Sequence, residues 1–147
     1  MNPVVRKAEY GDLCDLLELY THLHEPSVPE RDERLERVWD DILRTKGYSV
    51  LVAEENGRIV SSCTLIILLN LTRGQRPYAL IENVVTHAAF RGRGFARACM
   101  DEARRLAKEA GCYKIMLLTG SKSEGVLRFY QSCGYNSSDK TGFVQWL

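Results

Sequence analysis

The sequence lacks any long apolar run. Its longest unbroken apolar stretch, Leu65–Leu69, has five residues, and a membrane-spanning helix needs about 20. The first residues also lack the apolar stretch of a secretory signal. We therefore expect a cytoplasmic protein with no membrane partner.

Paired cysteines and clustered histidines are also missing. The five cysteines are odd in number and scattered, without a Cys-x-x-Cys pair, which favours free thiols over a disulfide framework or a zinc site. Of the three histidines, His22 and His24 are two residues apart, so a helix would place them on different sides. We expect no metal.

No strong excess of either charge is present. Lys and Arg number 20 against 19 Asp and Glu, a net charge of +1, which argues against a nucleic-acid partner. The small net charge nevertheless results from two regions of opposite charge. Residues Glu9–Asp41 include eleven acidic and three basic side chains, whereas Arg73–Arg97 include five basic and one acidic. This asymmetry suggests an anionic ligand at the second region and a cationic one near the first.

What is present indicates one globular domain, residues 1–147, with 45% apolar residues. Apolar periodicity and turn signals predict an α/β mixed sheet covered by helices. The Asn56-Gly57 pair predicts a hairpin between two strands. The expected helices are 12–22, 31–43, 94–110 and 124–132, and the expected extended segments are 3–8, 48–54, 58–69, 78–86, 113–119 and 143–147.

The segment Ile81–Arg97 carries the most chemistry. A strand leads through Arg91-Gly92-Arg93-Gly94 directly into a helix. Glycines permit a tight turn and leave backbone amides uncovered, and the first amides of a helix have no internal partners. Such a junction binds anions, a pyrophosphate in particular. The alternative is a glycine-rich connection with solvated arginines.

Three motifs together resemble the GNAT family of N-acetyltransferases. Arg91-Gly92-Arg93-Gly94-Phe95-Ala96 matches the family's [Q/R]-x-x-G-x-[G/A] signature, Ile81–Thr86 is similar to its fourth strand, and Leu127–Tyr135 is similar to its FY-x-x-x-G-[FY] helix end. Within the family, Gly111–Ile115 looks most like glucosamine-6-phosphate N-acetyltransferases. The Arg128-Phe129-Tyr130 stretch is similar to small aminoalkylphosphonate acetyltransferases.

The resemblance implies a sheet of about six or seven mostly antiparallel strands flanked by about four helices, with a V-shaped splay between strands 4 and 5. It also implies acetyl-CoA as cosubstrate. A bulge in the fourth strand would open the wedge for the cofactor arm. The expected cofactor contacts are the backbone of Val84, Val85 and Thr86, the loop residues Arg91, Gly92, Arg93, Gly94, Phe95 and Ala96, nearby Arg97, and Ser123 in place of a frequent asparagine.

Two side chains match the family's proton-transfer positions. Tyr130 would donate a proton to the leaving thiolate, the alternative being a packing role. Glu82 lies among apolar strand residues, where a carboxylate is costly unless it is paired or functional. It would be the base, or else a structural hydrogen-bond acceptor. The amide of Val84 or Val85 would polarise the thioester oxygen. Direct transfer leaves the cysteines as bystanders.

The acceptor expected from the resemblance is a small-molecule primary amine. The family places its acceptor by the first two helices, which are acidic here, so a cationic amine is favoured; Arg73 and Arg76 could instead serve a sugar phosphate. Acetylation of a protein N-terminus or lysine, and a CoA-binding module without turnover, remain alternatives. A homodimer is a further expectation.

Overall fold

The computed structural model describes residues 2–147. Five strands form one sheet in the order β1-β2-β3-β4-β5: β1 (Val5–Lys7), β2 (Tyr48–Glu55), β3 (Arg58–Leu68), β4 (Tyr78–Thr86) and β5 (Ile115–Met116). Neighbouring strands are antiparallel from β1 to β4, and β5 is parallel to β4. The predicted mixed sheet is therefore confirmed, but it has five strands in the described part of the chain rather than the six or seven expected.

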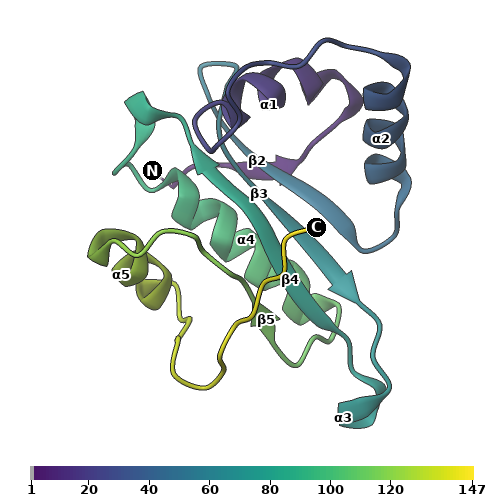
Figure 1. Cartoon of the computed structure of the whole chain (residues 1–147), viewed down its shortest axis with the longest axis vertical. Helices are drawn as coiled ribbons and strands as arrows, with labels where there is room; N and C mark the ends of the chain where they lie inside the picture. The colour runs from purple at the N-terminus through teal and green to yellow at the C-terminus, as the bar shows by residue number, and fades with distance from the viewer. Residues whose placement is uncertain (1) are drawn as a thin grey trace.

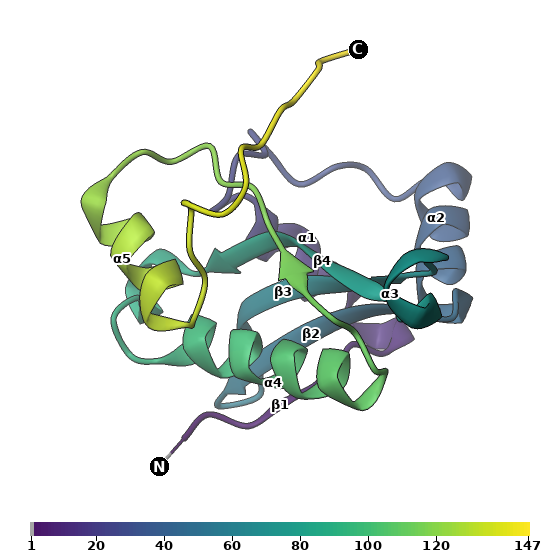
Figure 2. The same cartoon turned by 90° about the horizontal axis from the view of Figure 1, so that it is seen from below.

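Helices cover both faces of this sheet (Figures 1 and 2). The helix α4 (Phe95–Glu109) packs on one face, and α1 (Leu13–Tyr20) and α2 (Glu33–Arg44) pack on the other. The short helical turn α3 (Thr72–Gln75) lies between β3 and β4, and α5 (Glu124–Ser132) follows β5. Two apolar cores result, one on each face.

The turn between β2 and β3 forms as its sequence predicts. Glu55 pairs with Arg58, so Asn56 and Gly57 alone make the turn. Both have positive φ, 54° and 77°, as the two central residues of a type I′ hairpin turn require. Side chains alternate along β3, so Cys63 joins the core on the α4 side and Thr64 lies on the α1 side.

The C-terminal segment corrects one expectation. Residues 143–147 were expected to form a closing strand, but they pair with no strand of the described chain. Figure 2 shows this segment leading away from the sheet. The predicted strand 113–119 is also too long, because only Ile115 and Met116 pair with β4. A strand pattern gives a strand only where a partner backbone is within reach.

Candidate functional site

The site begins with a bulge in β4. Ser62 of β3 pairs with Val85, but Thr64, two residues later, pairs with Glu82. The strand β4 thus holds one residue more than β3 at this point, which is a β-bulge. Asn83 occupies it with a φ of 52°, a left-handed conformation that asparagine tolerates better than most residues. The predicted bulge is present.

Beyond the bulge, β4 has an open edge. The strand β5 pairs only with Ala79 and Leu80. The carbonyl of Val85 accepts a hydrogen bond from Ser61 Oγ at 2.9 Å and so faces β3, whereas the carbonyl of Thr86 accepts from Arg91 Nε at 3.3 Å. Because backbone groups alternate in direction along a strand, those of Val84 share the open edge with those of Thr86. This edge can pair with an extended ligand.

The loop between β4 and α4, which contains Gly92 and Gly94, is suited to bind an anion. Gly92 and Gly94 have φ of 72° and 85°, and a Cβ added at either would meet no atom within 4 Å. The helix α4 begins at Phe95, and no side chain of residues 2–147 caps it. Its first amides are therefore available to a ligand, and the positive end of a 15-residue helix dipole lies at the same point.

The predicted arginines of this loop are held by protein groups. Arg91 Nη2 donates to the carbonyl of His22 at 3.3 Å, which links the loop to the end of α1. Arg93 pairs with Glu55 and stacks over Phe90 and Phe95, with its guanidinium 5.2 and 5.5 Å from the ring centroids. Arg97 Nη1 donates to Ser132 Oγ of α5 at 3.2 Å. Their charges surround the loop, but their geometry is fixed by the fold.

Tyr130 projects from α5 into a half-buried aromatic cluster. Its ring centroid lies 5.2 Å from that of Phe129 and 6.4 Å from that of Tyr135. Burial raises the pKa of Tyr130 above its usual value, so the phenol stays protonated at neutral pH. Packing and proton donation are compatible here, because the cluster holds the ring while the hydroxyl makes no hydrogen bond to any described residue.

Ser123 is the N-cap of α5 rather than an isolated polar group. Its hydroxyl accepts a hydrogen bond from the amide of Val126 at 3.4 Å and one from Ser121 Oγ at 3.2 Å. The side chain expected at the cofactor thus has a structural role, which is to fix where α5, and with it Tyr130, begins.

Glu82 lies on the opposite side of β4 from α4. It pairs across the ladder with Thr64, and directly opposed residues share a face of the sheet. Glu82 is exposed, and its carboxylate has no ion pair or hydrogen bond in the described part of the chain. Its apolar strand neighbours suggested a costly position for a carboxylate, but Glu82 is accessible to water, and no hydrogen bond of the described residues supports the alternative of a structural acceptor.

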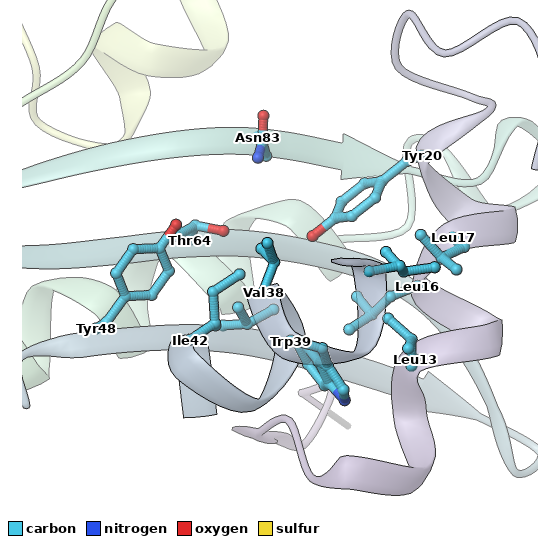
Figure 3. Close-up of a pocket in the computed structure, with 12 residues that line it drawn as sticks. Leu13, Leu16, Leu17, Tyr20, Val38, Trp39, Ile42, Tyr48, Thr64 and Asn83 are labelled. Carbon is cyan, nitrogen blue, oxygen red and sulfur yellow. The ribbon is translucent and has the colours of Figure 1, made fainter. Parts of the chain in front are cut away.

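A cavity of about 140 Å³ opens beside Glu82, between α1, α2 and the sheet. Figure 3 shows Asn83 of β4 at its edge and Tyr20, Tyr48 and Thr64 directed toward it. Sequence reasoning missed these four residues. A usable signal was Asn83, a polar residue that favours positive φ, in the middle of an apolar strand.

The two buried cysteines are poor nucleophiles. Cys63 and Cys99 are buried, and burial raises the pKa of Cys99 to about 12, so its thiolate is scarce at neutral pH.

Among residues 2–147, no group of three or more His, Cys, Asp or Glu side chains could hold a metal ion. No helix in that range is both long enough and apolar enough to span a membrane.

Comparison with known proteins agrees with this geometry. The family model described as "Acetyltransferase (GNAT) family" matches residues 13–135. A glucosamine 6-phosphate N-acetyltransferase from Trypanosoma brucei brucei is 33% identical over 138 residues, which cover 92% of this chain and 90% of that protein. An L-methionine sulfoximine/L-methionine sulfone acetyltransferase from Salmonella typhimurium is 29% identical, covering 97% of this chain and 88% of that protein.

A solved structure from Agrobacterium tumefaciens, assigned as an acetyltransferase, superposes with a TM-score of 0.91 at 47% identity, over 98% of this chain and 99% of the other. The bulged fourth strand, the glycine loop and the helix that carries Tyr130 thus occur in a chain that matches the family model over most of its length. The protein belongs to the GNAT family and is an acetyltransferase.

Proposed function

We propose that this acetyltransferase transfers an acetyl group directly from acetyl-CoA to the primary amine of a small molecule. The observation that carries the proposal is the bulge at Asn83. It opens the edge of β4 and, at the same point, leaves the carboxylate of Glu82 free on the face toward α1. In both cartoons the end of β4 lies between α1 and α5 (Figures 1 and 2), so the acceptor and Tyr130 can approach it from two sides.

The residues present fit acetyl-CoA, the cosubstrate of GNAT acetyltransferases. The open-edge backbone groups of Val84 and Thr86 suit the amides of an extended pantetheine arm. The uncapped amides at the start of α4, with the side-chain-free space at Gly92 and Gly94, suit a pyrophosphate. Bound there, acetyl-CoA would supply the acetyl group as a thioester.

The chain's own groups then divide the proton transfers. Glu82 accepts a proton from the acceptor's ammonium and passes it to solvent. As the neutral amine then attacks, Glu82 accepts the second proton that the nitrogen loses and Tyr130 donates one to the departing thiolate, so that amide and free thiol are the products; Tyr130 regains its proton from Glu82 through solvent. Of the two candidate oxyanion donors, the amide of Val84 is the better. The carbonyl of Val85 accepts a hydrogen bond from Ser61, so the backbone groups of Val85 face β3 and those of Val84 face the open edge.

A small-molecule acceptor is supported by the names of two relatives, which act on glucosamine 6-phosphate and on methionine sulfoximine or sulfone. The test is release of free thiol from acetyl-CoA, measured with a panel of small amines and with lysine-containing peptides. Thiol release with a small amine, together with the acetylated product by mass spectrometry, is the expected result. Release with peptides alone would overturn the small-molecule proposal.

The homodimer is also kept as a proposal. Phe143, Val144, Trp146 and Leu147 expose 89%, 65%, 88% and 116% of their reference areas. A set of large apolar side chains this exposed is typical of a protein–protein contact, and most soluble oligomers are formed by copies of one chain. We place this segment against a second copy.

A further inference from the structure

The cavity between α1, α2 and the sheet has a mainly apolar wall (Figure 3). The helices supply aliphatic side chains and the face of one indole. Its apolar lining residues are Leu13, Leu16, Leu17, Leu35, Val38, Trp39, Ile42 and Val50. Its volume, about 140 Å³, is close to that of a dry protein cavity of roughly 150 Å³ that holds benzene.

The polar groups of the cavity are neutral. They are the hydroxyls of Tyr20, Tyr48 and Thr64 and the amide of Asn83, and no charged side chain of residues 2–147 lines the cavity. Figure 3 shows the two tyrosine hydroxyls directed toward Thr64. Burial raises the pKa of Tyr20 to about 12, so that hydroxyl stays uncharged. Together these groups can hydrogen-bond a neutral polar atom but cannot neutralise an ion.

Two acidic side chains of α2 are held by other partners. Glu36 pairs with Arg31 and accepts a hydrogen bond from Tyr10, and Asp40 pairs with Arg44. The arginines suggested for a sugar phosphate are also elsewhere. Arg76 donates to the carbonyls of Gly111 and Cys112, and α3 lies at the opposite end of the molecule from α1 (Figure 1). A phosphate or a second ammonium in the cavity would be buried without a counter-charge, which is costly.

The cavity adjoins the reacting groups. Asn83, at its edge, is the neighbour of Glu82, and Thr64 in its wall pairs across the ladder with Glu82. Directly opposed residues have Cβ atoms about 5 Å apart. An amine positioned at Glu82 therefore has the mouth of the cavity beside its substituent.

We infer that the acceptor is a primary amine with an uncharged, mainly apolar substituent, about the size of a benzene ring, and that this substituent binds in the cavity between α1 and α2. The inference depends on the amine acetyltransferase activity proposed above. It names a substrate class different from the sugar phosphate of the Trypanosoma relative.

The kinetic test compares phenethylamine and isoamylamine with spermidine and glucosamine 6-phosphate in the thiol-release assay. We expect kcat/KM for the two apolar amines to be at least tenfold higher than for the other two. A preference for spermidine or glucosamine 6-phosphate would overturn the inference and leave the proposed function standing.

A matched pair of variants locates the binding. Val38 lines the cavity and is 48% exposed, so Val38→Phe fills the mouth without overpacking a buried core; Val28 is equally exposed at 48% but does not line the cavity. Val38→Phe should raise KM for phenethylamine at least fivefold and leave KM for acetyl-CoA unchanged, whereas Val28→Phe should change neither. Equal effects of the two variants would overturn the assignment.

A binding measurement separates the cavity from catalysis. Trp39 lines the cavity, and the chain's other tryptophan is Trp146. In a Trp146→Phe variant, phenethylamine should change the fluorescence of Trp39 without acetyl-CoA, and Val38→Phe should abolish that change. Should no amine release thiol, this titration still decides the inference. A saturable change supports apolar binding in the cavity, and its absence overturns it.

Discussion

At the residue scale, the proton-transfer roles proposed for two side chains rest on their different surroundings. Tyr130 is half-buried among aromatic rings, and burial raises its pKa, so its phenol is protonated at neutral pH and suits a proton donor rather than a base. Glu82 is exposed on the face toward the cavity and is suited to accept a proton from an arriving amine. The sequence indicated both residues, but the apolar neighbours of Glu82 could not show that its side chain is exposed.

Tyr130→Phe should lower kcat at least tenfold and leave CoA affinity unchanged, because the ring still packs and only the acid is lost. Steady-state thiol release and calorimetric CoA titration measure the two effects.

Since burial raises the pKa of Tyr130 above its ordinary value of about 10, the protonated acid is present below that raised pKa. The wild-type kcat should therefore show no loss from this group up to pH 9. Tyr113→Phe is the control, and unchanged turnover in Tyr130→Phe would remove Tyr130 from the mechanism.

At the element scale, the function depends on where β4 ends its pairing and α4 begins. The Asn56-Gly57 turn was predictable because two residues determine it locally. The bulge was expected only from the family resemblance, because its backbone shift arises from the registers of β3 on one side and the short β5 on the other. Apolar periodicity carries no information about either register.

Gly94→Glu should abolish CoA binding. The substituted carboxylate would enter the open space at the start of α4 and repel a pyrophosphate there. Gly94→Ala shares the backbone strain of a φ of 85° without the charge, and Gly120→Glu adds the charge in an open loop with unstrained φ. We expect both controls to retain binding by calorimetry. Retained binding in Gly94→Glu would contradict the loop assignment.

Ser123→Ala should destabilise the protein by about 1 kcal/mol through loss of the α5 N-cap, which lowers Tm by roughly 2–4 °C in a domain of this size. Ser123→Asp should keep both the cap and the Tm. Differential scanning fluorimetry measures the shift, and CoA titration checks the cofactor contact that the sequence suggested. A weaker CoA affinity with an unchanged Tm would restore that contact as the main role of Ser123.

At the scale of the whole molecule, two apolar cores position α1 and α2 on one face of the sheet and α4 on the other. The opposed charges of the sequence suggested an anionic ligand and a cationic one. The glycine loop agrees with the first. Apolar residues of the acidic segment line the cavity, but none of its acidic side chains does; Glu36 pairs with Arg31 and Asp40 with Arg44. Segment charge thus says little about a site when the charged side chains face outward.

The exposed C-terminal segment, residues 143–147, leads to a prediction about the oligomeric state. The sequence pattern of this segment predicted a strand, but a strand must pair with another strand, and within residues 2–147 this segment pairs with none. The wild type should be a dimer by sedimentation velocity, and the double variant Phe143→Glu, Trp146→Glu should be a monomer with an unchanged circular dichroism spectrum. Val4→Glu, at another apolar side chain that is 80% exposed, should leave the dimer intact. A monomeric wild type would reject the proposal.

We propose that Glu82, exposed beside the bulge in β4, takes the proton of the acceptor amine. The most direct measurement is the pH profile of kcat/KM for Glu82→Gln, with the amine that gives the fastest thiol release and with Glu109→Gln as the control. Without the base, the variant can use only amine that is already neutral, a fraction that rises tenfold per pH unit below the amine's own pKa. We predict a deficit of about 10²- to 10⁴-fold at pH 7 that narrows steadily toward pH 9, with wild-type affinity for CoA. A Glu82→Gln profile parallel to that of the wild type, or equal to it at pH 7, would contradict the account.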